Sequence, residues 1–86
     1  MKNKLFVGNL PWGVDDAALQ DAFASYGEIT EARVARERET GRSRGFGFVT
    51  FTTEEAAAAA LDGMNGADLQ GRNINVMFAN PPKEQM

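Results

Sequence analysis

The chain has 86 residues, the length of a single domain, and its formal net charge at pH 7 is −3. It contains no cysteine and no histidine, which excludes disulfides, zinc sites built from these residues and catalysis by the commonest general base. No apolar run approaches the roughly 20 residues of a membrane-spanning helix, and we expect no signal peptide, because residues 1–5 lead directly into a strand-like run. We therefore expect a cytoplasmic protein, or a nuclear one in a eukaryote, with no membrane partner.

The N-terminal half of the sequence predicts a strand, a helix and a second strand. Residues 4–9 and 29–36 have strand character, and residues 15–25 predict a helix with Asp15 as its N-cap. The helix carries one apolar stripe at helical spacing, formed by Leu19, Ala22, Phe23 and Tyr26. We expect this stripe, Tyr26 included, to pack into the core.

The C-terminal half begins with a polar, arginine-rich loop over residues 37–43 and a strand over residues 44–51. The pattern Thr52-x-x-Glu55 predicts a capping box that opens a second helix. The apolar stripe of this helix consists of Ala57, Ala60, Leu61 and Met64. A last strand is predicted over residues 72–79.

The resulting order of elements is β-α-β-β-α-β. Two amphipathic helices need one sheet face to bury against, so the sequence predicts an α+β fold, a two-layer sandwich with one sheet face left open. We expect this domain to cover residues 1–80. Residues 81–86 are predicted to be a disordered tail, because the two prolines at its start cannot donate to a strand ladder.

Side chains alternate along a strand, so each strand presents one face to the helices and one to the open side. The apolar positions that define the helix-packed face are Leu5, Val7, Val49, Phe51, Ile74 and Val76. Gly45 and Gly47 share that face and are expected to allow a helix to approach closely. The opposite parity predicts that Phe6, Phe46 and Phe48 lie on the open face. A second core or a dimer interface would be the alternative explanation for three such rings.

Positive charge is concentrated near this predicted aromatic surface. Residues 33–44 carry five arginines against two glutamates, although the whole chain is negative. Lys4, Arg33 and Arg44 flank the phenylalanines by parity. Aromatic rings together with cations are typical of single-stranded nucleic-acid binding, because every base has a π-face and every linkage a charge. For Arg33 and Arg44 a simple solvated face is the competing interpretation.

Two segments resemble the signature motifs of the RNA recognition motif family. The run Leu5-Phe6-Val7-Gly8-Asn9-Leu10 resembles the RNP2 hexamer, and residues 44–51 fit the RNP1 octamer at every position. The resemblance covers residues 4–79 and implies a four-stranded antiparallel, ferredoxin-like sheet of order 4-1-3-2. It also implies base stacking on Phe6, Phe46 and Phe48 and a phosphate contact at Arg44. As a single domain, the chain is similar to small bacterial and cyanobacterial RNA-binding proteins and to domains of glycine-rich RNA-binding proteins.

Several further residues are candidates for weaker contacts. On the last strand, Asn73, Asn75 and Met77 share the open face by parity, and Asn75 is the best placed to read a base edge. Asn9 is either a turn residue or a contact. Trp12 is expected to pack rather than to meet a base. The loop residues Arg36, Arg38 and Arg42 are predicted either to contact RNA or to form ion pairs with Glu37 and Glu39.

The sequence as a whole predicts a monomeric, non-enzymatic protein that binds short single-stranded RNA, with single-stranded DNA as an alternative ligand. The resemblance implies a platform for about two to four nucleotides. We expect a role in RNA metabolism or post-transcriptional regulation, with no cofactor, no metal and no small-molecule substrate. A protein-interaction module is one rival. An acylphosphatase, which shares the topology, is another, but no arginine follows the glycine-containing segment Gly8–Gly13.

Overall fold

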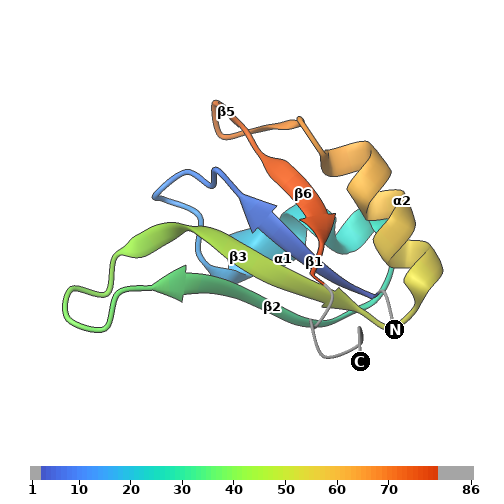
Figure 1. Ribbon diagram of the computed structural model, residues 1–86, viewed down its shortest axis with the longest axis horizontal. Helices are drawn as coiled ribbons and strands as arrows, with labels where there is room; N and C mark the ends of the chain where they lie inside the picture. Colours follow the sequence, from blue (N-terminus) through green and yellow to red (C-terminus); the bar gives the residue numbers. More distant parts are fainter. Residues whose placement is uncertain (1–2, 80–86) are drawn as a thin grey trace, which may run out of the picture.

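The computed structural model describes residues 3–79 as a four-stranded antiparallel sheet with two helices on one of its faces (Figure 1). The main elements are β1 (Lys4–Gly8), α1 (Asp16–Phe23), β2 (Ile29–Arg36), β3 (Ser43–Phe51), α2 (Glu54–Met64) and β6 (Asn75–Phe78). A 3-10 turn (Ala24–Tyr26) follows α1, and a small ribbon of β4 (Asp68–Leu69) and β5 (Arg72–Asn73) precedes β6. The predicted βαββαβ fold is confirmed. The predicted tail, residues 81–86, lies outside the described residues.

The strand order in the sheet is β2-β3-β1-β6. This order confirms the expected arrangement 4-1-3-2, with β6 as the fourth strand, and it places β1 and β3 side by side in the centre. Their register sets Phe6 opposite Phe48 and Gly8 opposite Phe46. The two segments that resemble RNP2 and RNP1 are therefore neighbours in space, although they are about forty residues apart in sequence.

Helix α1 begins where the sequence predicts. The Asp15 carboxylate accepts a hydrogen bond from the Ala18 backbone N–H at 2.8 Å, which satisfies one of the free donors of the first turn. Leu19 and Phe23 are fully buried, and Tyr26 is half-buried against the core as expected. The neighbouring Asp16 carboxylate accepts from the Val34 N–H at 2.7 Å and ties α1 to β2.

Helix α2 begins one residue later than the capping box predicts. Thr53, not Thr52, is the N-cap, and its hydroxyl accepts from the Ala56 N–H at 3.1 Å. The Thr52 N–H instead donates to the Glu28 carbonyl, which holds the turn after β3 against the segment before β2. The predicted stripe is otherwise confirmed, because Ala57 and Ala60 are buried, and Leu61 and Met64 pack against the core.

The core between helices and sheet is apolar, and none of the polar or charged side chains in residues 3–79 is buried. Helix α1 approaches the sheet closely at Gly47, where an added methyl group would lie 3.1 Å from Leu19 Cδ2 and would also overlap the Arg33 carbonyl of the neighbouring strand. Gly45 does not share this role, contrary to expectation: nothing lies within 4 Å of its missing Cβ, and its φ is +88°. It occupies an irregular stretch where the register between β2 and β3 shifts.

The last predicted strand is interrupted. Residues 72–73 pair with β4 in the small ribbon, closed by a turn in which Gln70 and Gly71 have positive φ. Only Asn75–Phe78 joins the main sheet. The parity argument is therefore wrong for Asn73, whose side-chain amide donates to the Gly66 carbonyl at 3.0 Å. Neither helix of the described chain is long and apolar enough to cross a membrane.

Candidate nucleic-acid interface

The three phenylalanines form a triangle on the sheet face opposite the helices. The ring centroids of Phe6 and Phe46 are 5.5 Å apart, those of Phe6 and Phe48 5.7 Å, and those of Phe46 and Phe48 6.2 Å. Each ring is half-buried, in contrast to the fully buried Phe23 and Phe51 of the core. Adjacent rings in tilted or edge-on contact hold one another in place while part of each remains open to solvent.

Gly8 leaves space for the Phe6 ring on the open face. It lies opposite Phe46 on β3 and opposite Asn75 on β6, so it shares the open face. A methyl group at Gly8 would come within 3.0 Å of Phe6 Cε2. The absence of a side chain at this position therefore lets the Phe6 ring lie low against the sheet.

Two cations stand close to the triangle. Lys4 Nζ is 4.9 Å from the centroid of the Phe48 ring, and Arg44 Cζ is 5.6 Å from that of Phe46. Both distances fall within the range of cation–π attraction. The rings and cations thus form one continuous surface, and a ligand that presents flat π-systems and anionic groups at short intervals would match both.

Strands β2 and β6 extend this surface to the sheet edges. One row crosses all four strands, with Arg33 opposite Phe48, Phe48 opposite Phe6 and Phe6 opposite Met77. Met77 is 54% exposed, and Asn75 is exposed in the next row. The structure therefore brings Lys4, Arg33, Arg44, Asn75 and Met77 to the open face, as parity predicts.

An acidic residue that the sequence argument did not single out also lies on this face. Glu31 is opposite Thr50 in the register, and its carboxylate oxygen lies 2.9 Å from Arg33 Nε. Both side chains are more than half exposed, so the pair is held weakly and is screened by salt. The signal was available in strand parity, because Glu31 and Arg33 are two residues apart on β2.

Asn9 is a turn residue in this structure. Its φ is +59°, a left-handed conformation that asparagine tolerates better than most residues. Its side-chain amide donates to the Asn73 carbonyl at 2.7 Å, and its side-chain oxygen accepts from Arg72 at 2.8 Å. Asn9 thus anchors the end of β1 to β5, and its RNA contact stays a prediction.

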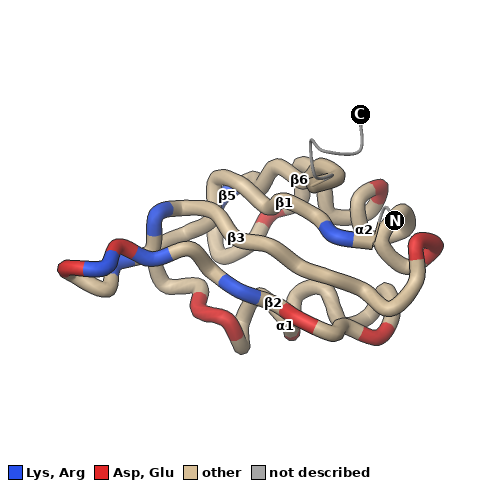
Figure 2. The backbone as a smooth tube through the Cα atoms, turned by 60° about the horizontal axis from the view of Figure 1, so that its bottom comes forward, with Lys and Arg blue, Asp and Glu red and all other residues tan. Residues whose placement is uncertain are grey.

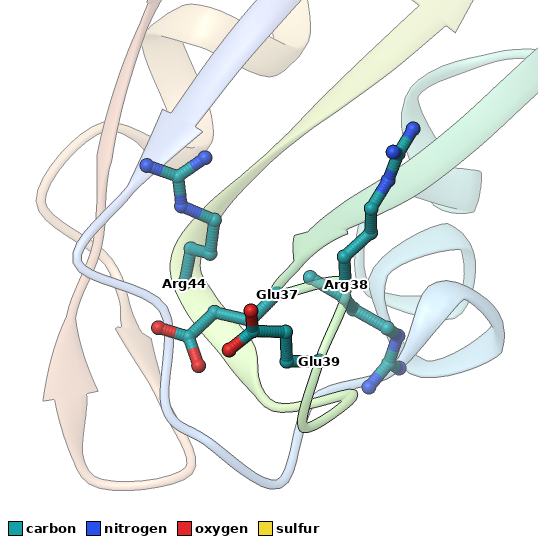
Figure 3. Close-up of a pocket in the computed structure, with 5 residues that line it drawn as sticks. Glu37, Arg38, Glu39 and Arg44 are labelled. Atoms are coloured by element: carbon teal, nitrogen blue, oxygen red, sulfur yellow. The ribbon is translucent and has the colours of Figure 1, made fainter.

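The loop between β2 and β3 extends beyond the sheet and carries equal numbers of arginines and glutamates, Arg38 and Arg42 against Glu37 and Glu39 (Figure 2). Glu37, Arg38, Glu39 and Arg44 line a shallow hollow of about 480 Å³ together with Arg36 (Figure 3). No ion pair joins the arginines and glutamates of residues 36–44, all of which the structure describes. The loop is instead closed by backbone bonds, among them Glu37 N–H to the Arg42 carbonyl at 2.8 Å.

Trp12 does not pack, contrary to expectation, and its side chain is 74% exposed. Leu10 and Pro11, the two residues before it, are buried and already fill the space under this loop. The indole instead lines a second hollow, of about 340 Å³, with Arg36, Gly41, Arg42 and Ser43 of the β2–β3 loop.

Comparison with known proteins identifies the family to which this fold and surface belong. The model of the RNA recognition motif family matches residues 5–75. Glycine-rich RNA-binding protein 2, mitochondrial, of Arabidopsis thaliana is 58% identical over 80 residues, which are 93% of this chain and 51% of the relative. The chain spans about half the length of the curated relatives it matches.

Comparison with solved structures gives the same family. The second RRM domain of the yeast poly(U)-binding protein Pub1 is 41% identical, with a TM-score of 0.83, over 91% of this chain and 94% of that one. A structure described as the Sxl-lethal protein/RNA complex is 32% identical, with a TM-score of 0.89, over 94% of this chain and 48% of that one.

Proposed function

Because this chain belongs to the RNA recognition motif family, we propose that it binds single-stranded RNA on the open face of its sheet. The observation that carries the proposal is the triangle of Phe6, Phe46 and Phe48 with Lys4 and Arg44 beside it. A relative named for RNA binding and a structural neighbour described as an RNA complex support the same ligand.

In the proposed mechanism, bases or sugars stack on the exposed parts of the three rings. Each stacking contact is worth about 1–3 kcal/mol by alanine substitution. The rings need no rearrangement to receive a base, because their mutual contacts already hold them on the sheet. Little of the stacking energy is then lost in ordering the protein side.

The cations on the same face would contact the RNA backbone. Arg44 lies beside Phe46 and neutralises a phosphate, and Lys4 and Arg33 both lie beside Phe48. With about three phosphates neutralised, the logarithm of the binding constant should fall with the logarithm of salt concentration with a slope of about −2. Such a slope describes a salt-sensitive interaction. We expect it to be weak and to involve a short stretch of about two to four nucleotides.

The remaining assignments are parts of the same proposal. The triangle of Phe6, Phe46 and Phe48 is called the platform below. Asn75 and Met77 are placed to meet base edges or sugars at its β6 side. The protein acts without catalysis, as a monomer, in RNA metabolism or post-transcriptional regulation, and single-stranded DNA is a competing ligand. A cytoplasmic location is also a prediction, and several of the relatives are named mitochondrial.

The decisive experiment is titration of a labelled pool of random-sequence RNA with wild type and with Phe46→Ala. We expect the variant to bind at least tenfold more weakly, because one stacking surface is lost. Its circular dichroism spectrum should match wild type, since the ring lies outside the core. Equal affinity of a folded Phe46→Ala protein would refute stacking on this face.

A further inference from the structure

The indole of Trp12 lies outside the platform and has no structural role that explains its position. It is 74% exposed, and it is the single tryptophan of the chain. One exposed apolar residue is ordinary by itself. What distinguishes Trp12 is the hollow beside it, which it shares with the side chains of Arg36 and Arg42. Ring and cations together repeat the chemistry of the platform.

This hollow continues from the platform along β3. Phe46 and Arg44 mark the end of the platform, and Ser43 and Arg42 come next in the chain and line the Trp12 hollow. The loop that bears Trp12 is held there by a hydrogen bond of 2.8 Å from the Leu10 N–H to the Gly45 carbonyl. At roughly 3.3 Å per residue, the chain from Phe46 to Arg42 spans at most on the order of 13 Å.

The two hollows that border the β2–β3 loop differ in the charge of the residues that line them. The larger one, next to Arg44, is also lined by Glu37 and Glu39 (Figure 3). The Trp12 hollow has arginines but no acidic residue in its lining. A polyanionic strand that leaves the platform past Arg44 therefore meets two carboxylates among the arginines of the first hollow and only cations in the second, so the second attracts it more strongly.

We propose that Trp12, with Arg36 and Arg42, forms an additional stacking subsite for a nucleotide of the same RNA strand, beyond the phenylalanine platform. The base stacks on the indole, and the two guanidinium groups contact the phosphates on either side. The inference rests on the proposed function. It adds that the RNA-binding site is longer than the sheet face alone, so that RNA beyond about four nucleotides gains specific affinity.

The test compares two labelled pools of random-sequence RNA, tetranucleotides and decanucleotides, on wild type, Trp12→Ala and Trp12→Phe. We expect Trp12→Ala to bind the decanucleotides about tenfold more weakly while its affinity for tetranucleotides is unchanged. Trp12→Phe, which retains a ring, should recover most of the loss. A longer RNA also offers more registers on the platform, but that statistical gain is the same in all three proteins.

Intrinsic fluorescence gives an independent readout, because Trp12 is the only emitter of its kind. Decanucleotides should quench its emission at saturation, tetranucleotides should not, and free N-acetyltryptophanamide corrects for absorbance by RNA. Gln20→Ala, on the exposed surface of α1, serves as the surface control. Equal decanucleotide affinity of wild type and Trp12→Ala, without quenching, would overturn the subsite and leave the platform intact. If Phe46→Ala bound both pools as tightly as wild type does, the platform would be overturned, and the subsite with it.

Discussion

The two faces of the sheet use the same residue type for different purposes. Phe48 and Phe51 lie three positions apart on β3, yet Phe51 is fully buried under the helices and Phe48 is half exposed beside Lys4. The helix-packed face has only apolar neighbours, whereas the open face combines rings with cations. The difference shows that exposure and charged surroundings, not hydrophobicity, distinguish a binding ring from a core ring in this protein.

The comparison predicts a large difference in stability between matched truncations on the two faces. Phe51→Ala should lower the free energy of unfolding by about 3–5 kcal/mol, because it leaves a cavity in the core. Phe48→Ala should lower it by only about 1 kcal/mol, mostly through lost ring contacts. Urea denaturation measures both values. Similar losses for the two variants would contradict the distinction between the faces.

Glycine positions offer a finer version of the same comparison. Gly47→Ala should destabilise the fold by about 1–3 kcal/mol, since the new methyl group overlaps the Arg33 carbonyl and presses on Leu19. Gly8→Ala should change stability by less than about 1 kcal/mol, because the Phe6 ring can move away. It should instead weaken RNA binding severalfold by lifting that ring. Thermal unfolding and RNA titration of both variants check these opposite outcomes.

Arg44 tests whether the cations of the open face act on phosphates. Arg44→Ala removes one phosphate contact, so the salt slope should flatten by about 0.7, from about −2 to about −1.3. Binding should weaken to a similar extent for all RNA sequences, since phosphates carry no sequence information. Titrations at several salt concentrations measure the slope, and an unchanged slope would assign Arg44 to the solvated surface.

The smallest expected effect concerns Glu31, which places a negative charge on the proposed RNA face. Glu31→Gln should strengthen RNA binding about twofold at low salt, because it releases the exposed Arg33. Asp62→Asn removes the same charge from the exposed surface of α2 and should have no effect, as the helix layer separates it from the platform. An equal gain for both variants would mean that only net charge matters.

Much of the site could be predicted because strand parity is a local property. Alternation along residues 4–9 and 44–51 places Phe6, Phe46 and Phe48 away from Leu5, Val7 and Val49, and the structure has the same arrangement. The predictions that were wrong concern loops and irregular segments. Gly45 lies in an irregular stretch, Asn73 in the small ribbon, and Trp12 on a loop whose buried space is already occupied by Leu10 and Pro11.

The sequence by itself determined the order of the elements, the two helix stripes and the face on which the residues of the regular strand segments lie, because these follow from backbone periods of 3.6 and 2.0 residues. Only the tertiary structure decided which residues meet across strands. The placement of Lys4 over Phe48 and the position of Trp12 beside the arginine loop depend on register, bulges and loop closure. These are set by contacts between distant segments, which no local pattern records.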